Sequence, residues 1–193
     1  MQGGPKPVEA RAASPADATR ARILLAAQQA FSSRGYGDVG LRAIATAAGC
    51  DTTLIRRYFG PKQRLFEEAL SRALDVTPLL DSSRENFGAR AVAFFTQEND
   101  TTIQPIQMLI FATADPVSRA TALRLLERHV IAPIAAWLGG GDGAARAARI
   151  SMLCSGWFLY SRVLPLPGDA DGEPGATNRW LAAQLQLVVD EAP

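Results

Sequence analysis

Four polar residues that lie close together in the chain carry side chains suited to chemistry with nucleic acid. They are two threonines and two arginines, Thr52, Thr53, Arg56 and Arg57. Hydroxyl and guanidinium groups can hydrogen-bond to base edges in the major groove of DNA and can also bind phosphates. The same side chains are typical of an ordinary solvated helix face, so the segments around them decide between the two interpretations.

These residues fall on the second of two short predicted helices. Apolar residues recur at helical spacing over 41–48 and again over 52–58, and Gly49 lies between the two segments. Gly49 suits the left-handed backbone of a tight turn, and Asp51 can cap the second helix. The contacts between the helices would come from Ile44, Ala45, Ala48, Leu54 and Ile55. The pattern predicts a helix-turn-helix, a motif that places its second helix in the major groove.

The charges are distributed unevenly along the chain. The net charge is only +1, but residues 1–66 contain ten Lys and Arg against four acidic residues and carry +6, whereas the remainder carries −5. A basic N-terminal third favours nucleic-acid binding there, because clustered cations release counterions from DNA. Chance segregation of charges on solvated faces would give the same distribution.

Three runs of residues frame the predicted helix-turn-helix. They are Arg22-Ile23-Leu24-x-Ala26-Ala27-x-x-x-Phe31-x-x-x-Gly35-Tyr36, Ile44-Ala45-x-x-Ala48-Gly49 and Tyr58-Phe59-Gly60-x-Lys62-x-x-Leu65-Phe66. Together they resemble the signature of the TetR family of transcription regulators, and they cover about a quarter of the chain. The resemblance implies that Thr52, Thr53 and Arg57 face bases or the flanking phosphates. It also implies that Tyr58 and Lys62 bind phosphate.

Three further positions bear on DNA recognition. Arg42 is an additional candidate for a phosphate contact. Gly40 stands where the family often has Thr or Ser, which removes a helix cap. Arg56 stands where the family commonly has Tyr, and an arginine can reach guanine with two hydrogen bonds. We therefore expect Arg56 to change the operator preference.

The elements that position these residues are helices throughout, because no alternating strand pattern persists. The predicted fold class is all-α, with an N-terminal three-helix helix-turn-helix domain followed by a helical body that the resemblance identifies as a ligand-binding and dimerisation domain. We divide the chain into a disordered tail at 1–14, a DNA-binding domain at 15–77 and the body at 78–193. The boundary is placed at Thr77-Pro78. Helices of the body are predicted near 84–98, 102–113, 116–138, 143–163 and 175–190, with Asp115 and Asp142 as caps.

The resemblance implies a repressor that binds a palindromic operator and is released when the body binds a small ligand. We expect an apolar ligand in a pocket lined mainly by apolar side chains with a few polar groups. The residues expected to line the pocket are aromatic or methionine: Phe94, Phe95, Met108, Phe111, Trp137, Met152 and Trp157. Each of these side chains would serve equally well in a hydrophobic core.

Dimer formation is expected from two apolar helices near the C-terminal end. The helix over 143–163 is apolar on more than one face, and the last helix has a stripe of Trp180, Leu181, Leu185 and Val188. The resemblance implies that these helices pair across a two-fold axis as a four-helix bundle. A homodimer also suits the binding of a double-stranded DNA operator, since one short helix reads few bases.

Other classes of protein find little support in the sequence. One histidine, two separated cysteines and no HExxH, GxSxG or GxxxxGK[ST] pattern argue against an enzyme, a metal site or a cofactor. Apolar runs are too short to span a membrane, and free Cys50 and Cys154 favour the cytoplasm. The remaining alternative is a helical interaction or scaffold protein without DNA binding, for which neutralising Arg57 or Lys62 would have no effect.

Overall fold

The computed structural model describes residues 14–81, 83–96, 105–166 and 175–191. Within these ranges the chain forms helices and turns and no β-strand, which confirms the predicted all-α class. Of the predicted tail at 1–14, only Ser14 lies among the described residues.

The N-terminal region contains α1 (Pro15–Ser33), the 3₁₀ turn η1 (Tyr36–Asp38), α2 (Leu41–Ala48), α3 (Thr52–Phe59) and α4 (Lys62–Ala73). A capping box starts α1: the Ser14 hydroxyl accepts a hydrogen bond from the Asp17 N–H, and the Asp17 carboxylate accepts one from the Ser14 N–H. The buried face of α1 includes Ile23, Ala27 and Phe31, which recur at helical spacing. Full burial of a side chain such as Phe31 stabilises the fold by roughly 1.5–3 kcal/mol.

The remainder contains α5 (Thr77–Leu80), α6 (Phe87–Thr96), α7 (Pro105–Ala112), α8 (Pro116–Leu126), α9 (Ala132–Leu138), α10 (Gly143–Phe158) and α11 (Ala176–Asp190). The π-helical turn η2 (Glu127–Ile131) joins α8 to α9, and a second one, η3 (Leu159–Val163), extends α10. The helices expected over 116–138 and 143–163 are therefore continuous but contain a π-helical turn. The sequence pattern did not indicate either turn.

The two predicted aspartate caps of the body behave differently. The Asp115 carboxylate accepts a hydrogen bond of 2.8 Å from the Ser118 N–H and caps α8 as expected. Asp142 precedes α10 but makes no capping hydrogen bond, so this prediction was wrong. Its carboxylate instead accepts a 3.0 Å hydrogen bond from Nε of Arg146. Arg146 is only 2% exposed, and a buried guanidinium needs a counter-charge.

The buried side chains form two clusters. The first contains residues of α1 to α4 together with Met108 and Ala112 of α7 and Ala122 and Leu125 of α8. The second is built from α5, α6, α9, α10 and α11. Between Leu74 and Leu79 the chain leaves the first cluster and enters the second, and the Thr77-Pro78 step that we took as the domain boundary lies in this interval. Helix α8, the turn η2 and helix α9 follow one another without a break and form one rod, the α8–α9 rod. However, α7 and the first half of this rod pack on the N-terminal helices.

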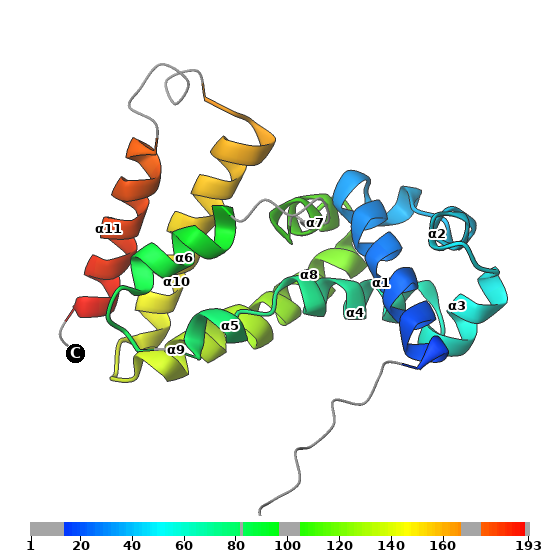
Figure 1. Ribbon diagram of the computed structural model, residues 1–193, viewed down its shortest axis with the longest axis horizontal. Helices are drawn as coiled ribbons and strands as arrows, with labels where there is room; N and C mark the ends of the chain where they lie inside the picture. Colours follow the sequence, from blue (N-terminus) through cyan, green and yellow to red (C-terminus); the bar gives the residue numbers. More distant parts are fainter. Residues whose placement is uncertain (1–13, 82, 97–104, 167–174, 192–193) are drawn as a thin grey trace, which may run out of the picture.

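Figure 1 shows the consequence of this arrangement. Helices α2 and α3 lie at one end of the molecule, α10 and α11 lie side by side at the other, and the α8–α9 rod runs between the two ends. Helix α4 packs against α1 and α8, and Arg124 of α8 forms an ion pair of 3.1 Å with Glu67 of α4. The rod therefore connects the helix that follows α3 with the helices at the far end.

Candidate nucleic-acid interface and ligand cavity

The turn between α2 and α3 has the geometry that a helix-turn-helix requires. Gly49 adopts the left-handed conformation with φ 63° and ψ 42°, which favours glycine because it has no Cβ. The N–H of Cys50 then bonds to the Ala45 carbonyl at 3.0 Å and closes the end of α2. Gly40 at the start of α2 offers no capping side chain, as expected from its type.

Asp51 caps the N-terminal end of α3. Its carboxylate accepts a 2.7 Å hydrogen bond from the Thr53 N–H, and bonding to Thr53 holds the pKa of the Asp51 carboxyl below its usual value. Ile55 and Phe59 are buried against the first cluster. The opposite face of α3 is consequently turned outward.

The polar residues predicted to contact DNA lie on or beside this outward face. Thr53, Arg56, Arg57 and Arg42 are exposed, whereas Thr52 and Tyr58 are partly buried. Among the residues that the structure describes, none forms a hydrogen bond or an ion pair with the guanidinium groups of the three arginines. A helix that presents unpaired guanidinium and hydroxyl groups has the chemistry needed to contact bases and phosphates.

Lys62 is arranged differently from these arginines. Its Nζ lies 4.3 Å from the centre of the Tyr36 ring and 3.5 Å from the Gly37 carbonyl oxygen. Burial lowers the pKa of Lys62, while the charges of Asp38 and Asp115 act in the opposite direction. Lys62 therefore joins the start of α4 to η1, and its expected role at a phosphate stays a prediction.

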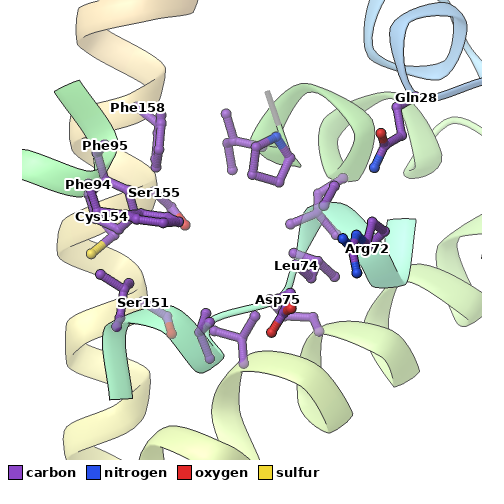
Figure 2. A pocket seen from close by; sticks show the side chains of 18 residues that line it. Gln28, Arg72, Leu74, Asp75, Phe94, Phe95, Ser151, Cys154, Ser155 and Phe158 are labelled. Atoms are coloured by element: carbon purple, nitrogen blue, oxygen red, sulfur yellow. The ribbon is translucent and has the colours of Figure 1, made fainter. Parts of the chain in front are cut away.

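A cavity of about 420 Å³ opens between the two hydrophobic clusters. One side is formed by Gln28 of α1 and the end of α4, and the other by α6 and α10; α7, α8 and η2 contribute apolar side chains (Figure 2). This volume lies within the range of small-molecule sites. Helices α1 and α4, which pack on the helix-turn-helix, thus share one cavity with α6 and α10 of the far end.

Two of the seven residues expected to line the pocket, Phe94 and Phe95, border this cavity. The other five lie outside the lining of this cavity. Met108 is buried in the first cluster, and Phe111 of α7 is half-buried away from the cavity. Trp137 packs against Phe87, Met152 is 71% exposed, and the indole N–H of Trp157 donates to Asn178.

The polar and small residues of the cavity wall were not predicted from the sequence: Gln28, Arg72, Asp75, Ser151, Cys154 and Ser155. Gln28 had a recognisable signal, because it is a polar residue within the apolar stripe of α1. The others lie on the ends or sides of helices and carried no signal of their own. Burial raises the pKa of Cys154 to about 12, so this thiol is not ionised near neutral pH.

Two models of known protein families match this chain, one in its N-terminal part and one in its C-terminal part. The model described as the tetracyclin repressor-like C-terminal domain matches residues 85–189, and the model of bacterial regulatory proteins of the tetR family matches residues 23–69. This chain belongs to the TetR family. The resemblance seen in the sequence is thereby confirmed, and the protein is a DNA-binding transcriptional regulator. TetR-family regulators are not enzymes, in agreement with the expectation from the sequence.

Solved structures with the same fold include TetR-family proteins from two organisms. A TetR-family regulator from Streptomyces coelicolor A3 shares 24% sequence identity and a TM-score of 0.52, covering 98% of this chain and 100% of that one. A putative TetR-family transcriptional regulator from Mesorhizobium loti MAFF303099 shares 18% identity and a TM-score of 0.58, with coverage of 92% and 96%.

A curated relative matches a shorter stretch. The HTH-type transcriptional activator FasR of Mycolicibacterium smegmatis is 34% identical over 61 residues, which is 32% of this chain but only 28% of that protein's length. Of the helices in the described ranges, none combines the length and the apolar character needed to cross a membrane.

Proposed function

We propose that this TetR-family protein is a repressor that binds a palindromic operator as a homodimer and is released by a small apolar ligand. The observation that carries the proposal is the cavity of about 420 Å³, whose walls come both from α1 and α4 and from α6 and α10. A ligand in this position would contact the DNA-binding region and the far end of the molecule at the same time.

The proposed DNA contacts use the outward face of α3. Thr52, Thr53, Arg56 and Arg57 would reach base edges or the flanking phosphates, and their side chains carry the donors that such contacts require. Arg42, Tyr58 and Lys62 would bind the DNA backbone on either side.

The proposed dimer contact uses α10 and α11. Leu181, Leu185 and Val188 of the expected stripe are buried within the protomer, where α11 packs on α6 and α10. Four large apolar side chains of these helices and their ends remain exposed: Met152, Tyr160, Trp180 and Leu187. Exposed apolar side chains on two adjacent helices are suited to pairing with a second copy about a two-fold axis.

The proposed release mechanism runs through α4. Its first residue, Lys62, follows α3 after a short turn, and its last turn borders the cavity. A ligand that binds better to a conformation with α4 displaced would change the separation of the two recognition helices and lower DNA affinity.

Selection of genomic fragments with the purified full-length protein at physiological salt tests the proposal. We expect recovery of a palindrome that the wild type binds tightly and that Arg57→Ala binds poorly, together with higher transcription of the adjacent gene when the regulator is deleted. Lower transcription after deletion would make the protein an activator, as the name of FasR describes that relative. Failure to enrich any fragment with folded dimer would overturn the proposal.

A further inference from the structure

The cavity has two chemically different ends. Three aromatic side chains, Phe94, Phe95 and Phe158, gather at the end formed by α6 and α10, and the rings of Phe95 and Phe158 lie edge to face with centroids 4.8 Å apart. Arg72, in the last turn of α4, and Asp75, just after α4, lie at the opposite end (Figure 2). A ligand that fills the cavity would therefore place an apolar part among the aromatic rings and its other end near charged groups.

Arg72 is an exposed residue of α4 that borders the cavity. Two other arginines pair with acidic residues of α4: Arg20 with Glu68, and Arg124 with Glu67. The guanidinium of Arg72 makes no hydrogen bond and no ion pair with the residues that the structure describes. Its planar set of N–H donors matches a carboxylate in a two-bonded geometry.

Asp75 lies near Arg72 but is engaged elsewhere. Its carboxylate accepts a 3.0 Å hydrogen bond from the Thr77 N–H at the start of α5. Hydrogen bonding to Thr77 is the main cause that holds the pKa of Asp75 below its usual value, with smaller contributions from the charges of Arg72 and His129. Asp75 is thus an ionised neighbour of Arg72 rather than its partner, and it would weaken an anion bound there without blocking it.

Ser155 provides a polar group on the side of the cavity that α10 forms. The hydroxyl of Ser151, one turn earlier, donates to the Ala147 carbonyl at 2.9 Å, as serines on helices often do. The hydroxyl of Ser155 makes no such bond within the described part of the chain, and Figure 2 shows its oxygen facing the open space. A hydroxyl or carbonyl group on the body of a ligand could bond to it.

We propose that the cavity binds a small organic anion: an apolar body, ring-bearing or aliphatic, that packs on Phe94, Phe95 and Phe158 and ends in one carboxylate held by Arg72. The inference rests on the proposed function as a ligand-responsive regulator, and it specifies the ligand as an apolar body with one charged end rather than a wholly apolar molecule. Arg72 lies in the last turn of α4, so binding of the carboxylate would be coupled to the helix that follows α3.

A matched pair of probes tests the charge requirement. Isothermal titration of the full-length protein with 6-phenylhexanoate and with 6-phenylhexan-1-ol compares one ring and chain with and without the carboxylate. We expect the acid to bind the wild type more tightly than the alcohol. Arg72→Gln should weaken the acid by about 10- to 100-fold and leave the alcohol nearly unchanged. Arg119→Gln, an exposed arginine of α8 outside the cavity wall, is the matched control.

Asp75→Asn gives a second readout of opposite sign. The amide oxygen of Asn can still accept the Thr77 hydrogen bond, while the negative charge beside Arg72 is removed. We expect the acid to bind this variant about two- to fivefold more tightly and the alcohol to be unaffected. A purely structural role of Arg72 would not produce opposite effects in these two variants.

Three outcomes would overturn the anion assignment. They are equal binding of the acid and the alcohol by wild type, equal weakening of both probes in Arg72→Gln, and binding of neither probe by protein that still recognises its operator. Failure of the proposed function itself would be seen in a different experiment, as the absence of an enriched palindrome in fragment selection. That experiment does not depend on Arg72.

Discussion

The side-chain amide of Gln28 donates a 3.0 Å hydrogen bond to the main-chain carbonyl of Ala69, and so joins the middle of α1 to the last turns of α4. Gln28 is only 7% exposed and also borders the cavity. A directional bond inside an otherwise apolar contact fixes the rotation of α4 relative to α1 more tightly than apolar packing alone. The position of α4 is the quantity that we propose a ligand changes.

Removal of this bond should lower the stability of the N-terminal region. We expect Gln28→Ala to reduce the free energy of unfolding by about 1–3 kcal/mol, because the variant loses the hydrogen bond and leaves a small cavity. Urea denaturation followed by circular dichroism measures the change. Gln29→Ala is the control, because Gln29 is the exposed next residue of α1 and its side chain forms no hydrogen bond with the described residues. Equal effects of the two variants would contradict a structural role for the Gln28–Ala69 bond.

Arg56 should determine part of the operator sequence. We expect Arg56→Ala to lose about 1–3 kcal/mol of discrimination at one base pair, because an arginine on the outward face of α3 can bond to two acceptors of a guanine. Fragment selection with the variant and anisotropy titrations on single-base variants of the operator measure this.

Arg42→Ala is the comparison for Arg56→Ala. If Arg42 contacts phosphate only, its loss should weaken all sequences alike and reduce the salt dependence of binding by about one unit in the log–log slope. An unchanged base preference in Arg56→Ala would remove Arg56 from the set of base-reading residues.

The helix-turn-helix could be predicted from the sequence because its determinants are local. Gly49, Asp51 and the spacing of Ile44, Ala48 and Ile55 lie within a dozen residues, and each has the conformation or burial that its type favours. The boundaries of α2 and α3 followed directly. No long-range contact was needed to specify them.

The cavity could not be predicted in the same way because its wall comes from segments far apart in the chain. The type of a side chain does not reveal whether it borders the cavity. That depends on how α1, α4 and α7 pack, and this packing buries Met108 but leaves Arg72 at the cavity wall. Met108 is buried in the first cluster and Trp157 in the second, whereas Phe94 borders the cavity. Tertiary packing selects among apolar residues that the sequence pattern treats as equivalent.

Gly88 should be intolerant of a side chain. A Cβ at this position would lie 1.9 Å from the carbonyl oxygen of Ala182, so α6 and α11 can approach as closely as they do only with glycine there. We expect Gly88→Ala to destabilise the protein by roughly 2–3 kcal/mol, since main-chain atoms must move to relieve the clash. Thermal unfolding measures the loss. Gly37→Ala, where a Cβ meets nothing within 4 Å, is the control and should unfold near the wild-type temperature.

Cys154 should be almost unreactive in the folded protein. Burial raises its pKa from 9.0 to about 12, so its thiolate fraction at pH 8 is about a thousandfold below that of an unperturbed thiol. A Cys50→Ala variant treated with a chromogenic disulfide reagent at pH 8 should show slow modification in buffer and rapid modification in urea. Because the folded pKa is raised, the contribution of this group to stability is complete below pH 9 and decreases as the pH rises toward 12. Rapid modification of folded protein would contradict the raised pKa of the Cys154 thiol.

The exposed apolar face of α10 and α11 should be required for the dimer. Leu187 of α11 is 60% exposed in the single chain, and a charge introduced there would be buried without a partner in the proposed interface. We expect Leu187→Glu to raise the dimer dissociation constant by at least about 100-fold, corresponding to about 2.7 kcal/mol. Sedimentation velocity measures this, together with loss of binding to a full palindrome.

Leu123→Glu is the matched control for Leu187→Glu, because Leu123 of α8 is 57% exposed and lies outside the proposed interface. Both substitutions replace an exposed leucine on a helix with the same charged residue, so any general effect on folding or solubility should be shared. A dimer that persists in Leu187→Glu, or that dissociates equally in both variants, would place the two-fold contact elsewhere on the molecule. The single-chain fold should be retained in both variants, because neither side chain belongs to a buried cluster.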